Sequence, residues 1–120
     1  MDIEIVAEGL RFPEGPVWLE DGSVIVTEVA AGVLTRILPD GRKETVAECG
    51  GGANGAAVGP DGMLYVCNNG GMVCYEENGL TLTTGEPLPD YRCGWVDRID
   101  PDTRKMDRLY GACDGRRVAG

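Results

Sequence analysis

Short apolar segments separated by glycine-containing turns run along the whole chain. Residues 14–26 (EGPVWLEDGSVIV) and residues 54–66 (NGAAVGPDGMLYV) each contain an apolar strand, an Asp-Gly turn and a second apolar strand. The two segments align at a constant offset of 40 residues, with a glycine, the Asp-Gly pair and a valine at matching positions. An Asp-Gly pair supplies the positive φ values that a tight hairpin turn requires. The pattern therefore predicts two copies of one antiparallel unit.

A second pair of segments extends each copy. Residues 36–43 (RILPDGRK) match residues 98–105 (RIDPDTRK) at an offset of 62 residues. In both, a strand enters a Pro-Asp turn and leaves through a basic pair into another strand. Residues 70–89, rich in Gly, Thr and Glu, form an insertion that lengthens the second copy. One unit thus holds four short strands.

Four short antiparallel strands at this period are typical of a β-propeller blade. An immunoglobulin-like sandwich also has many short strands, but it does not explain a repeated strand–DG–strand–PD–strand unit. We therefore predict an all-β fold in which residues 1–120 form an incomplete β-propeller domain. The expected parts are an N-terminal strand over 3–8, blade one over about 14–50, and blade two over about 54–113 with the insertion at 70–89.

Because propellers have roughly four to eight blades, two blades are expected to be an N-terminal fragment of a longer protein. Alone, such a fragment is expected to expose unpaired sheet edges, which favours association or strand swapping.

The residue types that are missing exclude several kinds of chemistry. The net charge of -9 excludes a basic nucleic-acid-binding face and is compatible with attracting a cation. The chain contains no histidine, so it holds no Ser-His-Asp triad and no His-ligated zinc of its own. Its single serine, Ser23, lies outside any G-x-S-x-G motif. Chemistry would therefore depend on carboxylates, amides, Arg or Lys, with or without a metal.

Cysteine usage and the start of the chain predict a cytoplasmic protein. The cysteines have no C-x-x-C spacing, and their odd number does not suit a disulfide framework, so reduced thiols are expected. Residues 1–4 (MDIE) are acidic and do not begin a signal peptide, and no apolar stretch approaches the ~20 residues of a membrane span. We expect neither a membrane nor a nucleic-acid partner, and the oligomeric state stays open. The cysteines are Cys49, Cys67, Cys74, Cys93 and Cys113.

Glu14 and Asn54 are the strongest site candidates. They align at the 40-residue offset, and each precedes the glycine that opens the first strand of its unit. The first strand of a propeller blade lines the central channel, so equivalent residues of successive blades converge on one axis. Carboxylate and amide oxygens are ligands that suit Ca²⁺. The alternative for Glu14 is a solvated turn residue.

Other residues are weaker candidates. Asn68 and Asn69 end the second strand of blade two, where they either reach the channel mouth and contact substrate, Asn68 first, or form part of a Cys-Asn-Asn-Gly-Gly turn. The acidic run at 97–102 lacks the D-x-D-x-D-G spacing of a calcium loop and is expected to be a solvated turn. Trp18 and Trp95 are expected to pack between blades.

Two segments resemble a known family. Residues 12–18 (FPEGPVW) resemble the E-[GS]-P-V-W opening of the SMP-30/gluconolactonase/LRE-like family, and residues 54–66 resemble the N-G, PDG and LYV motifs of its second blade. The resemblance covers nearly the whole chain. It implies a six-bladed propeller with one divalent cation in its channel, calcium first and zinc, manganese or magnesium as alternatives, which often hydrolyses sugar lactones.

Carried over by position, the resemblance implies that Glu14 is a metal ligand and that Asn54 contacts the sugar lactone near the metal. The remaining ligands and the base belong to later blades of the family, so no catalytic residue is expected in this chain and the chain alone is expected to be inactive. The implied reaction is ester hydrolysis, with the metal polarising the lactone carbonyl for attack by water. A non-catalytic NHL-like binding propeller and a strictosidine-synthase-like propeller remain alternatives, because fold alone does not fix function.

Overall fold

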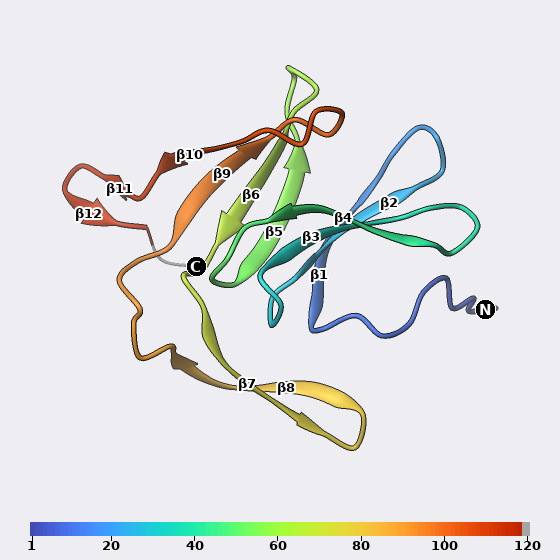
Figure 1. The fold of residues 1–120 in the computed structure, drawn as a ribbon, viewed down its shortest axis with the longest axis horizontal. Coiled ribbons are helices and arrows are strands. Elements are labelled where there is room, and N and C mark those ends of the chain that lie inside the picture. Colours follow the sequence, from blue (N-terminus) through green and yellow to red (C-terminus); the bar gives the residue numbers. More distant parts are fainter. Residues whose placement is uncertain (119–120) are drawn as a thin grey trace.

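The computed structural model describes residues 1–118 and is built entirely of short strands and turns (Figure 1). Two four-stranded antiparallel sheets form its body, and a separate two-stranded hairpin projects from the second sheet. None of the described residues forms a helix, so none forms a helix that could cross a membrane. The prediction of an all-β fold is confirmed.

The two sheets share one strand order. The first runs in the order β1-β2-β3-β4 and the second in the order β5-β6-β9-β10, so each is a simple meander once the insertion is set aside. The first sheet contains β1 (Pro13–Trp18), β2 (Val24–Glu28), β3 (Val33–Ile37) and β4 (Lys43–Glu48). The second contains β5 (Ala53–Val58), β6 (Leu64–Asn68), β9 (Trp95–Ile99) and β10 (Met106–Tyr110).

The insertion at 70–89 folds as a hairpin of its own and leaves the second sheet intact. Its strands are β7 (Met72–Glu77) and β8 (Leu80–Pro87), which pair only with each other among the described strands. A second small hairpin, β11 (Ala112–Cys113) with β12 (Arg116–Arg117), follows the second sheet.

Strand registers reproduce both offsets found in the sequence. Val24 of β2 pairs with Ile37 of β3, and Leu64 of β6 pairs with Ile99 of β9. Residues 24 and 64 differ by 40, and residues 37 and 99 differ by 62. The same four-stranded unit is therefore built twice, as the sequence pattern predicts.

The Asp-Gly turns of the two units use one set of side-chain contacts. Asp21 accepts a hydrogen bond from the backbone N–H of Ser23 and pairs with Arg36 of β3. Asp61 likewise accepts a backbone N–H two residues further on, and its carboxylate lies 3.0 Å from the guanidinium of Arg98 on β9. Each carboxylate thus ties a hairpin turn to the third strand of its sheet.

The hydrophobic core lies between the two sheets. Ile25 and Leu34 from the first sheet pack in one cluster with Leu64, Val66 and Ile99 from the second, and all five are at most 1% exposed. Alternation along β6 directs Leu64 and Val66 into this core. The sheets therefore stack face to face as neighbouring propeller blades do.

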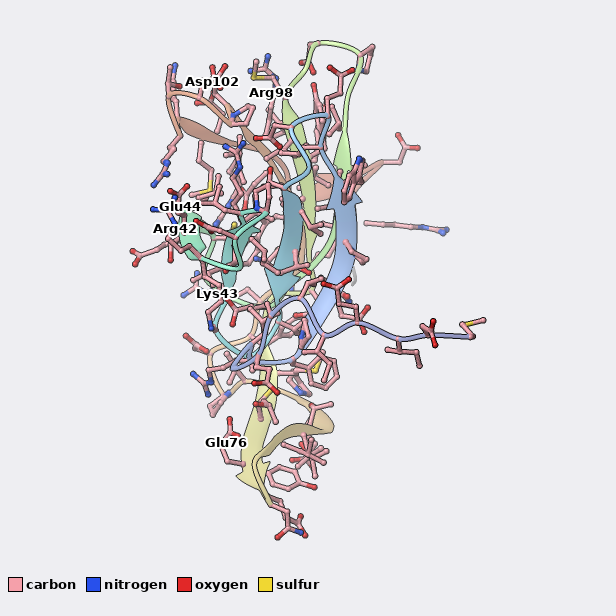
Figure 2. All side chains as sticks on the ribbon, turned by 90° about the vertical axis from the view of Figure 1, so that its right-hand side faces the viewer. Arg42, Lys43, Glu44, Glu76, Arg98 and Asp102 are labelled. Atoms are coloured by element: carbon pink, nitrogen blue, oxygen red, sulfur yellow. The ribbon has the colours of Figure 1, made fainter. Side chains whose placement is uncertain are left out.

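Charged side chains also connect the blades at their outer edge. Arg104, in the turn between β9 and β10, donates to the carbonyl oxygen of Thr45 at 2.9 Å and lies 3.5 Å from the Glu44 carboxylate on β4. Figure 2 shows Glu44 along the same side of the molecule as Arg98 and Asp102. These contacts are exposed, so the core rather than the ion pair fixes the packing.

One expectation from the sequence is wrong. Residues 3–8 form no strand, because no main-chain ladder pairs with them; Lys43 donates one hydrogen bond to the Glu8 carbonyl oxygen, and the segment is otherwise largely exposed. Trp18 is 72% exposed, since alternation along β1 places it on the face opposite to Val17. Blade two packs on the Val17 face, so the expected packing of Trp18 between blades stays a prediction.

The inner strands β1 and β5 approach each other closely at Gly15. Gly15 has a φ of 51°, and a Cβ atom added there would lie 2.9 Å from the backbone nitrogen of Ala56. Its repeat partner Gly55 has open space around an added Cβ. Of these two repeat partners, Gly15 is the one that needs to be glycine for steric reasons.

We predict that Gly15→Ala lowers the free energy of unfolding by about 1–3 kcal/mol, because alanine is strained at positive φ and its methyl group would push β1 away from β5. The matched control Gly55→Ala should change it by less than about 0.5 kcal/mol. Urea denaturation followed by circular dichroism measures both. Equal effects of the two substitutions would contradict the close approach.

Four cysteines are free thiols, namely Cys49, Cys67, Cys74 and Cys93, and Cys113 lies outside the side chains that the structure describes. Burial raises the pKa of Cys49 to about 12, and the nearby Asp97 carboxylate acts in the same direction. Cys67 is exposed.

Iodoacetamide at pH 8 should therefore alkylate Cys67 and leave Cys49 unmodified in the folded protein, because the thiolate is the reactive form. Peptide mass spectrometry measures the two sites separately. In urea both cysteines should react. Early modification of Cys49 without urea would show that the core between the sheets is open.

Candidate functional site

One buried hydroxyl group brings the two main site candidates together. Thr27 Oγ1 lies 3.0 Å from the carbonyl oxygen of Glu14 and 2.6 Å from that of Asn54. Thr27 is fully buried near the end of β2, and its hydroxyl contacts the backbones of the inner strands β1 and β5. The repeat alignment thus corresponds to a real meeting of the two backbones.

Both candidates also stand at irregularities in their strands. The β1–β2 register shifts between Glu14 and Val17, and the β5–β6 register shifts between Ala53 and Gly55, a step that contains Asn54. Such shifts bend a strand and redirect its side chains, and they are frequent beside active sites. The Glu14 side chain is exposed, whereas Asn54 is half-buried and lines a cavity.

Glu14 and Asn54 offer oxygen atoms of the kind that bind a hard divalent cation, but these two side chains are too few to complete its coordination. Glu14 offers a carboxylate and Asn54 an amide oxygen, whereas calcium takes six to eight oxygen ligands in general. Within residues 1–118 no group of three or more Asp, Glu, Cys or His side chains could hold a metal ion. This chain can therefore contribute part of a metal site.

In each blade a polar side chain at the end of the second strand binds the segment that precedes the inner strand; we call this contact a polar clamp. Glu28, the last residue of β2, accepts the backbone N–H of Arg11 at 2.8 Å. Asn68, its partner 40 residues later at the end of β6, accepts the backbone N–H of Gly52 at 2.9 Å. Each clamp fixes the segment that leads into the inner strand of its blade.

Asn68 makes further backbone contacts. It donates to the Gly50 carbonyl oxygen at 2.7 Å and accepts a second hydrogen bond from Gly70 N–H at 2.9 Å. With 1% exposure and both amide atoms engaged, Asn68 holds two loops together. The substrate contact expected of Asn68 gains no support from this geometry.

Asn69 lines a cavity of about 310 Å³ between β5 and the inserted hairpin. Its neutral walls combine two amides, one phenol and several apolar groups. The lining residues are Asn54, Asn69, Gly71, Met72, Gly85, Pro87 and Tyr91. The sequence places Asn68 and Asn69 side by side, but only their side-chain directions show which one faces the cavity.

The acidic run at 97–102 has a structural role. Asp97 is fully buried and accepts a hydrogen bond from the indole N–H of Trp95 at 2.8 Å, while the Arg108 guanidinium stacks 3.8 Å from the Trp95 ring centroid. Asp100 caps the next turn, and hydrogen bonds from the backbone N–H groups of Thr103 and then Asp102 lower its pKa. The expected solvated turn is thus found at Asp100, but Asp97 is an interior residue.

Two blade-like four-stranded sheets pack face to face, and the backbones of Glu14 and Asn54 approach each other at the Thr27 hydroxyl. The profile of the SMP-30/Gluconolactonase/LRE-like region matches residues 12–115. The chain belongs to this family, as its opening motif suggests, and the prediction of a β-propeller is confirmed.

Individual relatives are distant. A gluconolactonase from Zymomonas mobilis subsp. mobilis (strain ATCC 31821 / ZM4 / CP4) is 24% identical over 104 residues, which make up 75% of this chain and 29% of that protein. The crystal structure of selenomethionine-substituted virginiamycin B lyase from Staphylococcus aureus aligns with a TM-score of 0.41 at 17% identity, over 87% of this chain and 42% of that one. The chain therefore spans less than a third of the gluconolactonase that it matches.

Replacing Thr27 by valine should lower the free energy of unfolding by about 1–3 kcal/mol, because two partly buried carbonyl groups would lose the buried hydroxyl that donates to them while side-chain volume is nearly kept. Thr45→Val, on an exposed position of β4, is the control and should change it by less than about 0.5 kcal/mol. Thermal unfolding of both variants measures the difference. A Thr27→Val protein as stable as the control would remove the hydroxyl as the link between inner strands.

Proposed function

We propose that this chain supplies the first two blades, and the first part of the active site, of a metal-dependent sugar-lactone hydrolase. The observation that supports this most is the close approach of the Glu14 and Asn54 backbone carbonyls, from successive inner strands, at the Thr27 hydroxyl. Membership of the SMP-30/gluconolactonase/LRE-like family and the distant similarity to a gluconolactonase agree with it.

In the proposed mechanism Glu14 helps to hold the divalent cation, for which calcium is the first choice and zinc, manganese or magnesium are alternatives. When bound, such a cation polarises the lactone carbonyl and activates water. Asn54 orients a ring hydroxyl or stabilises the developing oxyanion, a task typically contributing about 3 kcal/mol for one donor. In this mechanism none of the described residues acts as the general base. The 120 residues alone are therefore inactive.

A cytoplasmic location is part of the same proposal, because four of the thiols are free. The second candidate function is that of a non-catalytic binding propeller. The neutral cavity beside Asn54 favours it, since a cavity of this kind binds a small molecule without needing a metal.

In the longest natural form of the protein, Glu14→Gln should reduce D-glucono-δ-lactone hydrolysis on the order of 100-fold or more and weaken divalent-cation binding, because an amide replaces a charged ligand. Glu20→Gln, an exposed residue of blade one, is the matched control. A pH-stat assay and calorimetric titration with Ca²⁺ measure the two effects. Unchanged turnover in Glu14→Gln would remove Glu14 from the site, and cation-independent ligand binding without hydrolysis would favour the binding propeller.

A further inference from the structure

The inserted hairpin leaves and re-enters the second sheet at the end where the inner strand β5 begins. In the strand registers Ala53 pairs with Asn68, and Asn68 pairs with Trp95, so the start of β5, the end of β6 and the start of β9 lie together. The hairpin connects the last two of these points (Figure 1). The base of the hairpin lines the cavity that Asn54 also lines. The hairpin is therefore placed where it can cover that cavity.

One face of the hairpin is turned toward the rest of the chain. Met72, Cys74 and Glu76 alternate along β7 and therefore share a face, since the register shift at this point adds residues on β8 rather than on β7. Met72 lines the cavity, and the Glu76 carboxylate lies 3.6 Å from the guanidinium of Arg11, in the segment that leads into β1. Cys74 lies between the other two and is half-buried. The hairpin thus extends from blade two to the start of blade one.

Glu76 is held in position for this ion pair by its neighbour across the hairpin. Thr81 Oγ1 donates a hydrogen bond to Glu76 Oε1 at 2.7 Å, and the same oxygen faces Arg11. Figure 2 shows Glu76 on the hairpin, beyond the ends of the two sheets. Glu77, the next residue of β7, pairs with Leu80 on the opposite face. Of two adjacent glutamates, one is therefore directed toward Arg11.

Few contacts attach the hairpin to the rest of the chain. β7 and β8 pair only with each other among the described strands. The chain enters the hairpin through Gly70 and Gly71, whose φ values are 86° and 100°, and leaves it through residues 88–94, which lie outside the named strands. The side chains of Arg11 and Glu76 are each 55% exposed. An ion pair this exposed shifts an equilibrium by no more than about fivefold, and salt screens it. Such a contact favours an attached hairpin without excluding a released one.

We propose that the hairpin is a strap whose position is controlled by the Arg11–Glu76 ion pair. With the pair formed, the hairpin extends from blade two to the segment before β1 and restricts access to the cavity beside Asn54. With the pair broken, the hairpin turns about Gly70 and Gly71 and opens that cavity. Ionic strength, which screens exposed charges, shifts the strap between the two positions. The strap acts in this way whether the propeller hydrolyses a lactone or only binds a ligand.

Alkylation of Cys74 by iodoacetamide at pH 8 reports the position of the strap, because this thiol lies on the face that the attached hairpin turns toward the rest of the chain. In the longest natural form of the protein, Glu76→Gln and Arg11→Gln should each raise the rate at Cys74 about 2- to 5-fold. Glu77→Gln, which removes the same charge from the opposite face, is the matched control and should change the rate little. Peptide mass spectrometry measures the rates, with the exposed Cys67 as internal reference.

The two variants separate release of the strap from a local effect of charge on the thiol. A nearby negative charge slows alkylation and a positive one speeds it, so charge alone would make Glu76→Gln faster and Arg11→Gln slower. Release of the strap makes both faster. Raising NaCl to about 0.5 M should likewise speed alkylation of Cys74 in the natural protein and have little further effect in Glu76→Gln. A rise in only one of the two variants, no rise in either, or an equal rise in Glu77→Gln would overturn the strap, whatever the outcome of the lactone assay.

Discussion

The contact between the inner strands β1 and β5 is the constraint on which the rest of the structure depends. At this contact a glycine with positive φ allows two backbones to approach, and one buried threonine hydroxyl lies between the carbonyls of Glu14 and Asn54. A larger residue at Gly15 or an apolar one at Thr27 would separate the strands. Without that approach, the backbones of Glu14 and Asn54 would not lie side by side.

Repetition explains how such a contact arises from a short chain. Glu28 and Asn68 stand at equivalent positions, and each holds the segment that precedes an inner strand. The residues differ, but both present a side-chain oxygen to a backbone N–H group. A carboxylate and an amide can therefore serve the same structural purpose, which is why residue type alone does not distinguish a clamp from a binding residue.

Function is best sought where the repeats differ. Val29 and Asn69 occupy the same backbone environment, yet only the second introduces an unsatisfied polar group into the interior. The second blade also carries the inserted hairpin, which adds a wall beside that same residue. Both departures from the repeat lie beside Asn54, in the wall of one cavity.

The sequence by itself determined the repeating unit, its turns and the equivalence of Glu14 and Asn54 in the repeat. These features depend on short-range turn chemistry and on period-two alternation, and equal units place equivalent residues on neighbouring inner strands. It did not determine that residues 3–8 lack a strand, that Trp18 faces outward, or that Asn69 rather than Asn68 borders the cavity. Those outcomes depend on which sheet edges are available and on the direction of each side chain after packing, and such long-range contacts exist only once the blades have assembled.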